Sequence, residues 1–208
     1  MSFHLPKLYA ITDRRLSGLS HAEQLVRLAA GGARLIQLRE KYLPSRAFYQ
    51  EAEAALLLAR ELGVKVIIND RVDIALALQA YGVHLGQDDV PPENARKLLG
   101  PAAIIGLSVH NAKQAKEAVG SPIDYLAAGP IFRTSSKDNP DPVLAFDGLR
   151  EIRRTTGNIP LVAIGGINLE NTRAVFEAGA DAIAVIGALL SHPGAIEGST
   201  RSFLALTS

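Results

Sequence analysis

The chain has 208 residues, 48% of them hydrophobic, which is enough for one well-packed domain. Its formal charge of +1, from 22 Lys and Arg against 21 Asp and Glu, provides no net basic field to draw it onto nucleic acid or anionic lipid, so a small-molecule partner is favoured. Because cysteine is absent, disulfides, thiolate zinc sites and cysteine nucleophiles are excluded.

No change of composition divides the chain, so we expect a single domain over residues 1–208. The N-terminal sequence MSFHLPKLYAITD lacks a charged start followed by a long apolar region, and no later stretch approaches the roughly 18 apolar residues of a membrane span. We therefore expect a cytoplasmic protein. Association of several copies, as a homo-oligomer, is compatible with the sequence but is not predicted by it.

Short apolar runs, rich in β-branched residues, alternate with helical patterns along the chain. Nearly unbroken apolar runs are typical of strands buried on both faces, as in a parallel sheet covered by helices. In chain order, the expected elements are strand 8–11, helix 21–30, strand 35–38, helix 45–62, strand 66–68, helix 72–79, strands 83–85 and 104–107, helix 111–119, strand 125–128, helix 146–155, strand 161–164, helix 169–178 and strand 183–186. This alternation is typical of repeated β/α units.

The entry into several strands repeats one pattern of helix end, tight turn and new strand. It is seen in AGGARLIQ (30–37), QAYGVHL (79–85), GSPIDYL (120–126) and EAGADAIAV (177–185). Glycine or a small residue there supplies the turn that closes a helix. Eight such units predict a (β/α)₈ TIM barrel at the compact end of the range of that α/β fold. A doubly wound open sheet is the alternative.

Two of the predicted strands are followed at once by acidic and amide side chains. Asn69-Asp70 follows the run that ends at residue 68, and GQDD (86–89) follows the run that ends at residue 85. Carboxylate and amide oxygens are the hard ligands that Mg²⁺ prefers, especially a Mg²⁺ that also holds phosphate. We therefore expect Asp70 and Asp89 to bind a metal, although either one alone could be a helix N-cap.

Cationic side chains follow other strands. Because the active site of a (β/α)₈ barrel forms at the carboxyl ends of its strands, these side chains are expected to share one mouth with the acids. Arg39, Lys41 and Lys137 suit a diphosphate leaving group, whose charge grows as its bond to carbon breaks. The run 39–41 could alternatively be a solvated surface segment.

Glycine turns follow the seventh and eighth predicted strands. Gly165-Gly166 and Gly187 expose backbone N–H groups where such barrels often bind a phosphate. Thr134 and Ser136, after the sixth strand, could add hydroxyl donors. Such turns also serve simply to pack a strand against a helix, and that alternative stays open.

The histidines are less informative. His84 lies within a predicted strand and His110 follows another, so each is either a core histidine or an acid–base group. His4 and His192 lack a recognisable motif and His21 lies near a predicted helix start. For these three we expect surface or capping positions.

Eight segments, in the correct order over nearly the whole chain, resemble the thiamine phosphate synthase family. They are LYAITD (8–13), IQLREK (36–41), INDRVDIAL (68–76), GVHLGQDD (82–89), GLSVH (106–110), GPIFRTSSK (129–137), VAIGGI (162–167) and GADAIAV (179–185). No single segment is sufficient to identify the family, but eight segments in register are highly specific for it. The resemblance implies a transferase that joins a pyrimidine methyl diphosphate to a thiazole phosphate, releasing pyrophosphate and giving thiamine phosphate.

The resemblance also assigns the site, residue by residue. The residues matched to the pyrimidine diphosphate are Gln37, Leu38, Arg39, Glu40, Lys41, Asn69, Ser108 and Lys137, of which Arg39, Lys41, Ser108 and Lys137 would be catalytic. Those matched to the thiazole phosphate are Thr134, Ser135, Ser136, Gly166, Ile186 and Gly187. Asp70 and Asp89 match the Mg²⁺ ligands, so Mg²⁺ is the expected cofactor.

The sequence departs from the family pattern in the thiazole half. Arg133 stands where proline is usual, Ser136 where threonine is usual, and Gly187 where a serine often donates to the thiazole phosphate. The related thiazole tautomerase would use His110 to shuttle a proton and characteristically lacks the metal-binding acids, so the two retained acids favour the synthase. A barrel that binds thiamine precursors without catalysis is the third alternative.

Overall fold

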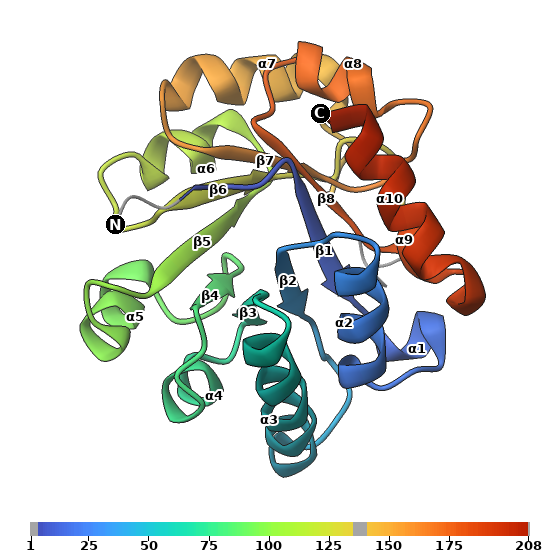
Figure 1. The fold of residues 1–208 in the computed structure, drawn as a ribbon. Coiled ribbons are helices and arrows are strands. Elements are labelled where there is room, and N and C mark those ends of the chain that lie inside the picture. Colours follow the sequence, from blue (N-terminus) through green and yellow to red (C-terminus); the bar gives the residue numbers. More distant parts are fainter. Residues whose placement is uncertain (1–3, 135–140, 208) are drawn as a thin grey trace.

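The computed structural model describes residues 4–134 and 141–207, and eight parallel strands form a closed barrel within them (Figure 1). The strands are β1 (Leu8–Thr12), β2 (Leu35–Leu38), β3 (Lys65–Asn69), β4 (Gly82–Leu85), β5 (Ile104–Val109), β6 (Tyr125–Ala128), β7 (Leu161–Ile164) and β8 (Ala182–Val185). They pair in the order of the sequence, and β1 pairs with β8 to close the ring. The predicted barrel is confirmed, and the open doubly wound sheet is wrong.

The helices surround the barrel and alternate with its strands (Figure 1). The helices expected from the sequence are α2 (His21–Ala30), α3 (Ser45–Glu61), α4 (Val72–Ala77), α6 (Ala112–Ala118), α7 (Ala145–Thr156) and α8 (Thr172–Glu177). The sequence did not predict α1 (Arg14–Ser17), α5 (Pro92–Leu99), α9 (Gly187–Leu190), the 3₁₀ helix η1 (Pro193–Ala195) or α10 (Ile196–Thr207). In α5 only Ala95 is buried, so its apolar periodicity is too weak to stand out.

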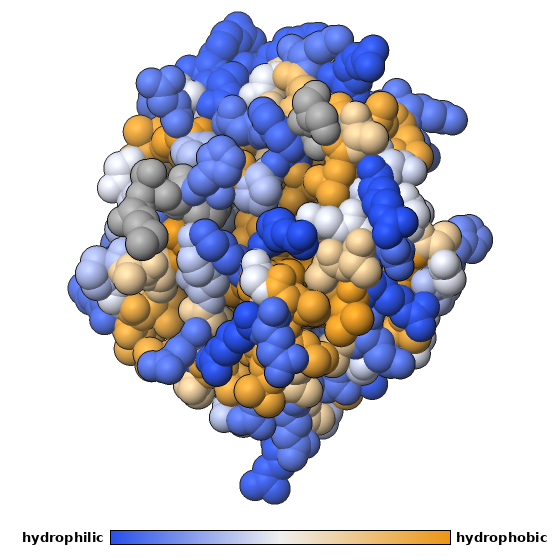
Figure 2. Space-filling model, viewed as in Figure 1, coloured by the Kyte–Doolittle hydropathy of each residue, from blue (hydrophilic) through white to orange (hydrophobic). Residues whose placement is uncertain are grey.

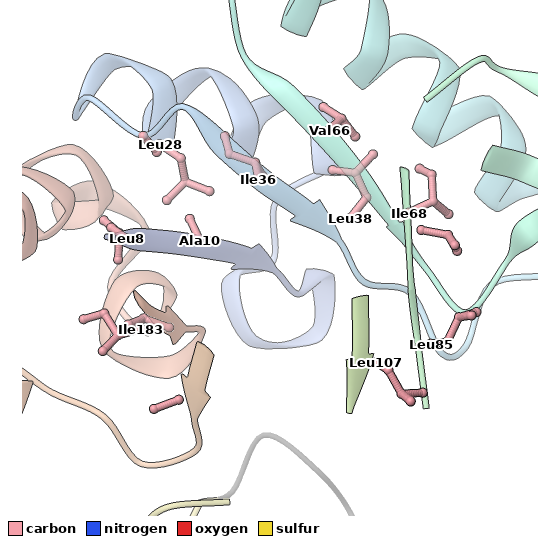
Figure 3. Packing of buried hydrophobic residues seen from close by; sticks show 14 of the residues in the cluster. Leu8, Ala10, Leu28, Ile36, Leu38, Val66, Ile68, Leu85, Leu107 and Ile183 are labelled. Atoms are coloured by element: carbon pink, nitrogen blue, oxygen red, sulfur yellow. The ribbon is translucent and has the colours of Figure 1, made fainter. Parts of the chain in front are cut away.

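The apolar core has two layers separated by the wall of strands. Figure 3 shows part of the outer layer, in which side chains such as Leu8, Ile36 and Ile68 point away from the barrel axis toward the helices. Side chains that alternate with these form an inner layer, whose members are Tyr9, Ile11, Leu35, Ile67, Ile104, Tyr125, Ala127, Val162, Ala182 and Ala184. Two tyrosine hydroxyls are thereby enclosed within the barrel.

The face shown in Figure 2 carries both hydrophilic and apolar side chains. Figure 2 shows hydrophilic side chains over much of one face, with apolar residues exposed between them. The exposed apolar side chains are scattered over separate elements, among them Leu57 on α3, Leu98 on α5 and Val119 after α6. Of the helices in the described part of the chain, none is long and apolar enough to cross a membrane.

Gly106 on β5 lies opposite Tyr125 on β6, and its lack of a side chain makes room for the tyrosine ring. A Cβ at Gly106 would lie 2.1 Å from Cζ of Tyr125, which is fully buried. We therefore expect Gly106→Ala to lower the free energy of unfolding by about 1–3 kcal/mol, measured by urea denaturation.

Gly198→Ala is the matched control for this substitution. A Cβ at Gly198 meets no atom of the described residues within 4 Å, and Gly198 lies inside α10, where alanine is the better helix former. Its stability should be unchanged or slightly higher. An equal loss of stability in both variants would show that the tyrosine ring is not the cause.

Candidate active site

A cavity of about 740 Å³ opens at the carboxyl ends of the strands, and all eight strands or the loops that follow them contribute to its lining. Its lining includes the predicted site residues Gln37, Arg39, Lys41, Asn69, Asp70, Asp89, Ser108, Thr134, Gly166, Ile186 and Gly187. Residues far apart in the sequence therefore meet here because the parallel barrel gathers all its strand ends at one face.

Two residues of the predicted set do not turn their side chains into this cavity. Leu38 is fully buried in the outer core layer, because Gln37 takes the inward position on β2 and side chains alternate along a strand. Glu40 turns back on its own loop, where Oε1 accepts the backbone N–H of Tyr42 at 2.8 Å and of Leu43 at 3.2 Å. Ser135, Ser136 and Lys137 lie outside the described residues.

The two predicted metal ligands lie side by side. The carboxyl groups of Asp70 and Asp89 are within hydrogen-bonding reach of each other. Lys41 Nζ lies 2.5 Å from Asp70 Oδ2, and Gly86 N–H donates to Asp89 Oδ2 at 2.7 Å. Burial raises the pKa of Asp89, the Gly86 N–H opposes this, and the neighbouring Asp70 carboxyl raises the pKa further. Such a pair attracts a cation.

The donor set fits Mg²⁺. Asp70 and Asp89 both line the cavity and present hard oxygen ligands. Among the described residues, three or more His, Cys, Asp or Glu side chains nowhere gather into a metal-binding group. Asp70 and Asp89 would be the carboxylates that hold a metal here, and one or two protein carboxylates are usual for Mg²⁺.

Arg39 is held in place by an acid that the sequence interpretation did not single out. Its Nη1 donates to Asp13 Oδ2 at 2.9 Å, and both side chains are largely buried. Asp13 follows β1 directly, caps α1 by accepting the N–H of Leu16, and donates its own N–H to Gln24 Oε1 at 2.9 Å. The sequence signal that could have identified Asp13 was an acidic residue directly after a strand, as at Asp70. This network fixes a cation at the cavity wall.

Asn69 presents an unused donor. The side chain is 6% exposed, lines the cavity, and its Nδ2 has no hydrogen-bond partner among the described residues. A buried amide N–H without a partner is costly, so such groups in a cavity wall commonly await a ligand. Its position beside Asp70 makes this N–H group available to an acceptor atom of a bound ligand.

A chain of polar side chains crosses the barrel interior beneath the cavity. Gln37 Nε2 lies 2.9 Å from Tyr9 Oη, which is 3.0 Å from Tyr125 Oη. Tyr125 Oη is in turn 3.0 Å from His84 Nδ1, and His84 Nε2 is 2.9 Å from Ser108 Oγ. Burial lowers the pKa of His84 to about 4, so its ring is neutral near pH 7. His84 is therefore a hydrogen-bonded interior residue that also lines the cavity.

The Gly165-Gly166 turn follows β7, on the side of the barrel opposite the two acids, whereas Gly187 after β8 is the first residue of α9 and not part of a glycine turn. Gly165 and Gly166 have φ of 100° and 65°, and a Cβ at Gly166 would lie 2.5 Å from the carbonyl oxygen of Arg133. Backbone geometry thus requires these glycines for packing, whatever they bind. Thr134, Gly166, Ile186 and Gly187 nevertheless all line the cavity, and so does Arg133.

Two other histidines have defined environments. The expectation that His21 is a surface or capping residue is wrong, because its side chain is fully buried with Nδ1 2.7 Å from Thr12 Oγ1. Burial lowers the pKa of His21, while the nearby Glu40 and Glu51 carboxylates oppose this. His110 lines the cavity with Nδ1 2.6 Å from the carbonyl oxygen of Gly129.

The fold and the site together define a (β/α)₈ barrel enzyme whose cavity combines paired carboxylates, cations and glycine turns. A family model described as thiamine monophosphate synthase matches residues 8–189, and the chain belongs to this family. The family predicted from the eight sequence segments is thus confirmed, and with it the prediction of an enzyme of the transferase type.

Comparison with individual relatives supports the same family. The thiamine-phosphate synthase of Roseiflexus sp. (strain RS-1) is 44% identical over 200 residues, covering 96% of this chain and 84% of that protein. That of Syntrophomonas wolfei subsp. wolfei is 47% identical over 195 residues, covering 93% and 92%. The solved thiamine phosphate pyrophosphorylase from Pyrococcus furiosus has a TM-score of 0.85 and 40% identity, over 96% of this chain and 94% of that one.

Proposed function

We propose that the enzyme condenses 4-amino-2-methyl-5-(diphosphooxymethyl)pyrimidine with 4-methyl-5-(2-phosphooxyethyl)thiazole to give thiamine phosphate and pyrophosphate. The bond between the pyrimidine methylene carbon and the diphosphate oxygen breaks, and its electron pair leaves with pyrophosphate. The thiazole nitrogen then forms the new bond to that carbon. Neither step requires a side-chain nucleophile, in keeping with a chain that has no cysteine.

This proposal rests on one observation: two groups of residues with different chemistry lie on opposite sides of the cavity. Paired acids and cations follow β2, β3 and β4, whereas the Gly165-Gly166 turn follows β7 and the start of α9, at Gly187, follows β8. Two phosphorylated substrates need such an arrangement, with the leaving diphosphate on one side and the phosphate of the attacking ring on the other. Bringing them together removes much of the entropic barrier to their reaction.

The leaving-group side would use the acids and cations. Asp70 and Asp89 would hold Mg²⁺, which when bound offsets the charge that grows on the diphosphate. Arg39 and Lys41 line the same side of the cavity and add positive charge to the leaving oxygens. Lys137, outside the described residues, is proposed as a further cation, while Asn69, Gln37 and Ser108 are proposed to bind the same substrate by hydrogen bonds.

The other side would hold the thiazole phosphate. Thr134, Gly166, Ile186 and Gly187 line it, and Ser135 and Ser136, outside the described residues, are proposed to add hydroxyl donors. Arg133 also lines the cavity, so the departure from the family's usual proline adds a cation to this half. That the enzyme is cytoplasmic and that one domain spans residues 1–208 stay predictions, and association of copies is compatible with the sequence without being predicted by it.

The function is tested by incubating the purified chain with both substrates and MgCl₂ and measuring thiamine phosphate and pyrophosphate together. We expect equimolar products, loss of activity in excess EDTA, and recovery when Mg²⁺ is returned. Isomerisation of a thiazole carboxylate phosphate without pyrophosphate release would support the tautomerase instead. Binding of both substrates without turnover would support a non-catalytic barrel. Full activity in EDTA would contradict the metal assignment.

A further inference from the structure

The loop after β2 carries an acid between two cations, and the three side chains do not point the same way. Arg39 and Lys41 line the cavity, whereas the Glu40 side chain is 6% exposed and lies outside the cavity lining. Its Oε1 accepts the backbone N–H groups of Tyr42 and Leu43. The loop therefore separates the negative charge of Glu40 from the cavity.

The second oxygen of this carboxyl group faces a buried histidine. His21 Nε2 lies 3.4 Å from Glu40 Oε2, and the His21 side chain is fully buried. No group in the described part of the chain makes a hydrogen bond of ordinary geometry with Nε2. Because an unpaired ring nitrogen is costly to bury, Glu40 Oε2 is the partner that Nε2 has available.

The His21 ring is fixed by its other contacts. It belongs to the first residue of α2, whose backbone N–H donates to Glu51 Oε2 at 3.1 Å. The ring lies 5.8 Å from the Phe48 ring at an angle of 55°, and its Nδ1 is 2.7 Å from Thr12 Oγ1. The ring is thus a rigid point against which the loop side chain of Glu40 is placed.

Thr12 joins the same ring to the backbone of the loop. Its Oγ1 accepts the backbone N–H of Arg39 at 3.3 Å and lies 3.2 Å from the carbonyl oxygen of Gln37. Since a hydroxyl group both donates and accepts, Thr12 accommodates His21 Nδ1 with or without a ring hydrogen. An ionised Glu40 can only accept, so its carboxylate favours a hydrogen on Nε2.

Glu40 is charged near neutral pH. Burial raises the pKa of its carboxyl group, but the N–H groups of Tyr42 and Leu43, together with the His21 ring, hold that pKa below its usual value. If this carboxylate turned into the cavity, it would stand between Arg39 and Lys41. It would then repel a bound anion and offset the charge of the two cations.

We propose that His21 is a positioning residue, which holds the Glu40 carboxylate out of the cavity and thereby keeps its negative charge from the diphosphate beside Arg39 and Lys41. That the ligand is a diphosphate rests on the proposed function. The contact between His21 and Glu40 does not depend on it.

The direct test is the protonation of His21 in the unmodified enzyme, read from the ¹⁵N chemical shifts of its imidazole nitrogens at neutral pH. The signals are assigned by their loss in His21→Gln. We expect a hydrogen on Nε2, in a neutral or a charged ring. A ring that is bare at Nε2 could not hold the carboxylate and would overturn the proposal. This measurement requires no substrate.

A second substrate-free test removes the ring nitrogens. His21→Leu keeps apolar bulk against Phe48, and we expect the backbone amides of Tyr42 and Leu43 to exchange their hydrogens about two- to tenfold faster as Glu40 is released. His192→Leu is the matched control, because that histidine is exposed before η1 and does not line the cavity.

Unchanged exchange in a folded His21→Leu variant would contradict the anchoring role. If the melting curve shows that His21→Leu does not fold, His21→Gln takes its place, since its side-chain amide can still donate to Glu40 and should preserve slow exchange. The protonation of Nε2 in the unmodified enzyme decides the matter if neither variant folds.

Steady-state kinetics test the consequence for the substrate. We expect His21→Leu to raise the KM for the pyrimidine diphosphate about tenfold, from the repulsion of one unit charge at an effective dielectric constant of roughly 20. The KM for the thiazole phosphate should be unchanged, and His192→Leu should alter neither. An equal rise in both KM values would indicate general damage to the barrel and would overturn the proposal.

A double-mutant cycle separates the charge of Glu40 from the packing of His21. Glu40→Gln removes the charge but keeps an oxygen for the amides of Tyr42 and Leu43, so adding His21→Leu in this background should change KM less than twofold. The same tenfold rise in both backgrounds would mean that His21 acts only through packing. An unmodified enzyme that is protonated on Nε2 but gives no condensation would refute the proposed function and leave the contact standing.

Discussion

Asp70→Asn is expected to lower kcat by about a hundredfold or more, because one metal-binding carboxylate loses its charge while the side chain keeps its size. Asparagine is the appropriate replacement, since Asp70 has φ of 62° and asparagine tolerates this left-handed region better than most residues. The ion pair with Lys41 is also lost. Its side chains are 43% and 20% exposed, so stability should fall by less than about 1 kcal/mol.

Asp89→Asn should behave in the same way, and both variants should require more Mg²⁺ for half-maximal activity. The measurements are kcat as a function of Mg²⁺ concentration and the melting temperature of each variant. Asp73→Asn is the matched control, because its carboxylate pairs with Arg71 on the exposed surface of α4 and does not line the cavity. A normal kcat for Asp70→Asn at limiting Mg²⁺ would contradict the assignment of the metal site.

Arg39→Ala is the second substitution with a large expected effect. Loss of one electrostatic donor at a developing charge costs roughly 3–4 kcal/mol in well-studied sites, so kcat should fall by about a hundredfold or more. The loss should appear in kcat rather than KM if Arg39 acts mainly on the transition state. The variant also leaves Asp13 without its partner, which should lower the free energy of unfolding by about 1–3 kcal/mol.

Two companion variants separate these effects. Arg39→Lys keeps a positive charge but loses the planar guanidinium that reaches Asp13, so we expect an intermediate kcat. Asp13→Asn leaves Arg39 present but weakens its anchor, and a smaller loss of kcat is expected. Assays are run well below the melting temperature of each variant. A tenfold rise in KM with a normal kcat for Arg39→Ala would show that this side chain only helps to bind substrate.

The fold was predictable because each strand carries its own local signal. The eight apolar runs correspond to β1 through β8, with shifts of one or two residues at some ends. The pairing of β1 with β8 was inferred from the number of units, since no local pattern encodes closure. Helices α5 and α10 escaped prediction, because α5 buries only Ala95 and α10 includes Gly198 and several hydroxyl residues.

The site was predictable where charged, polar or glycine residues follow the end of a strand. Asp70 and Asp89 line the cavity as expected, and so does Arg39. The direction in which each side chain points was harder to predict. Leu38 points outward, and Glu40 folds back onto its own loop. Tyr9 and Tyr125 look like ordinary core aromatics in the sequence, because their hydrogen bonds join strands that are distant along the chain. Their part in the site depends on closure of the barrel.

The closing pair of strands has a consequence for how the enzyme is made. Among the eight strands of the barrel, β8 leaves the ribosome last, and it must find β1, which leaves it first. Until it does, the ring is open and the wall contributed by Ile186 and Gly187 is missing from the cavity. Such distant pairing carries a large loop-closure entropy and is slow to form. The cavity is therefore complete only after β8 has paired with β1, and we expect a fragment that lacks β8 to be inactive.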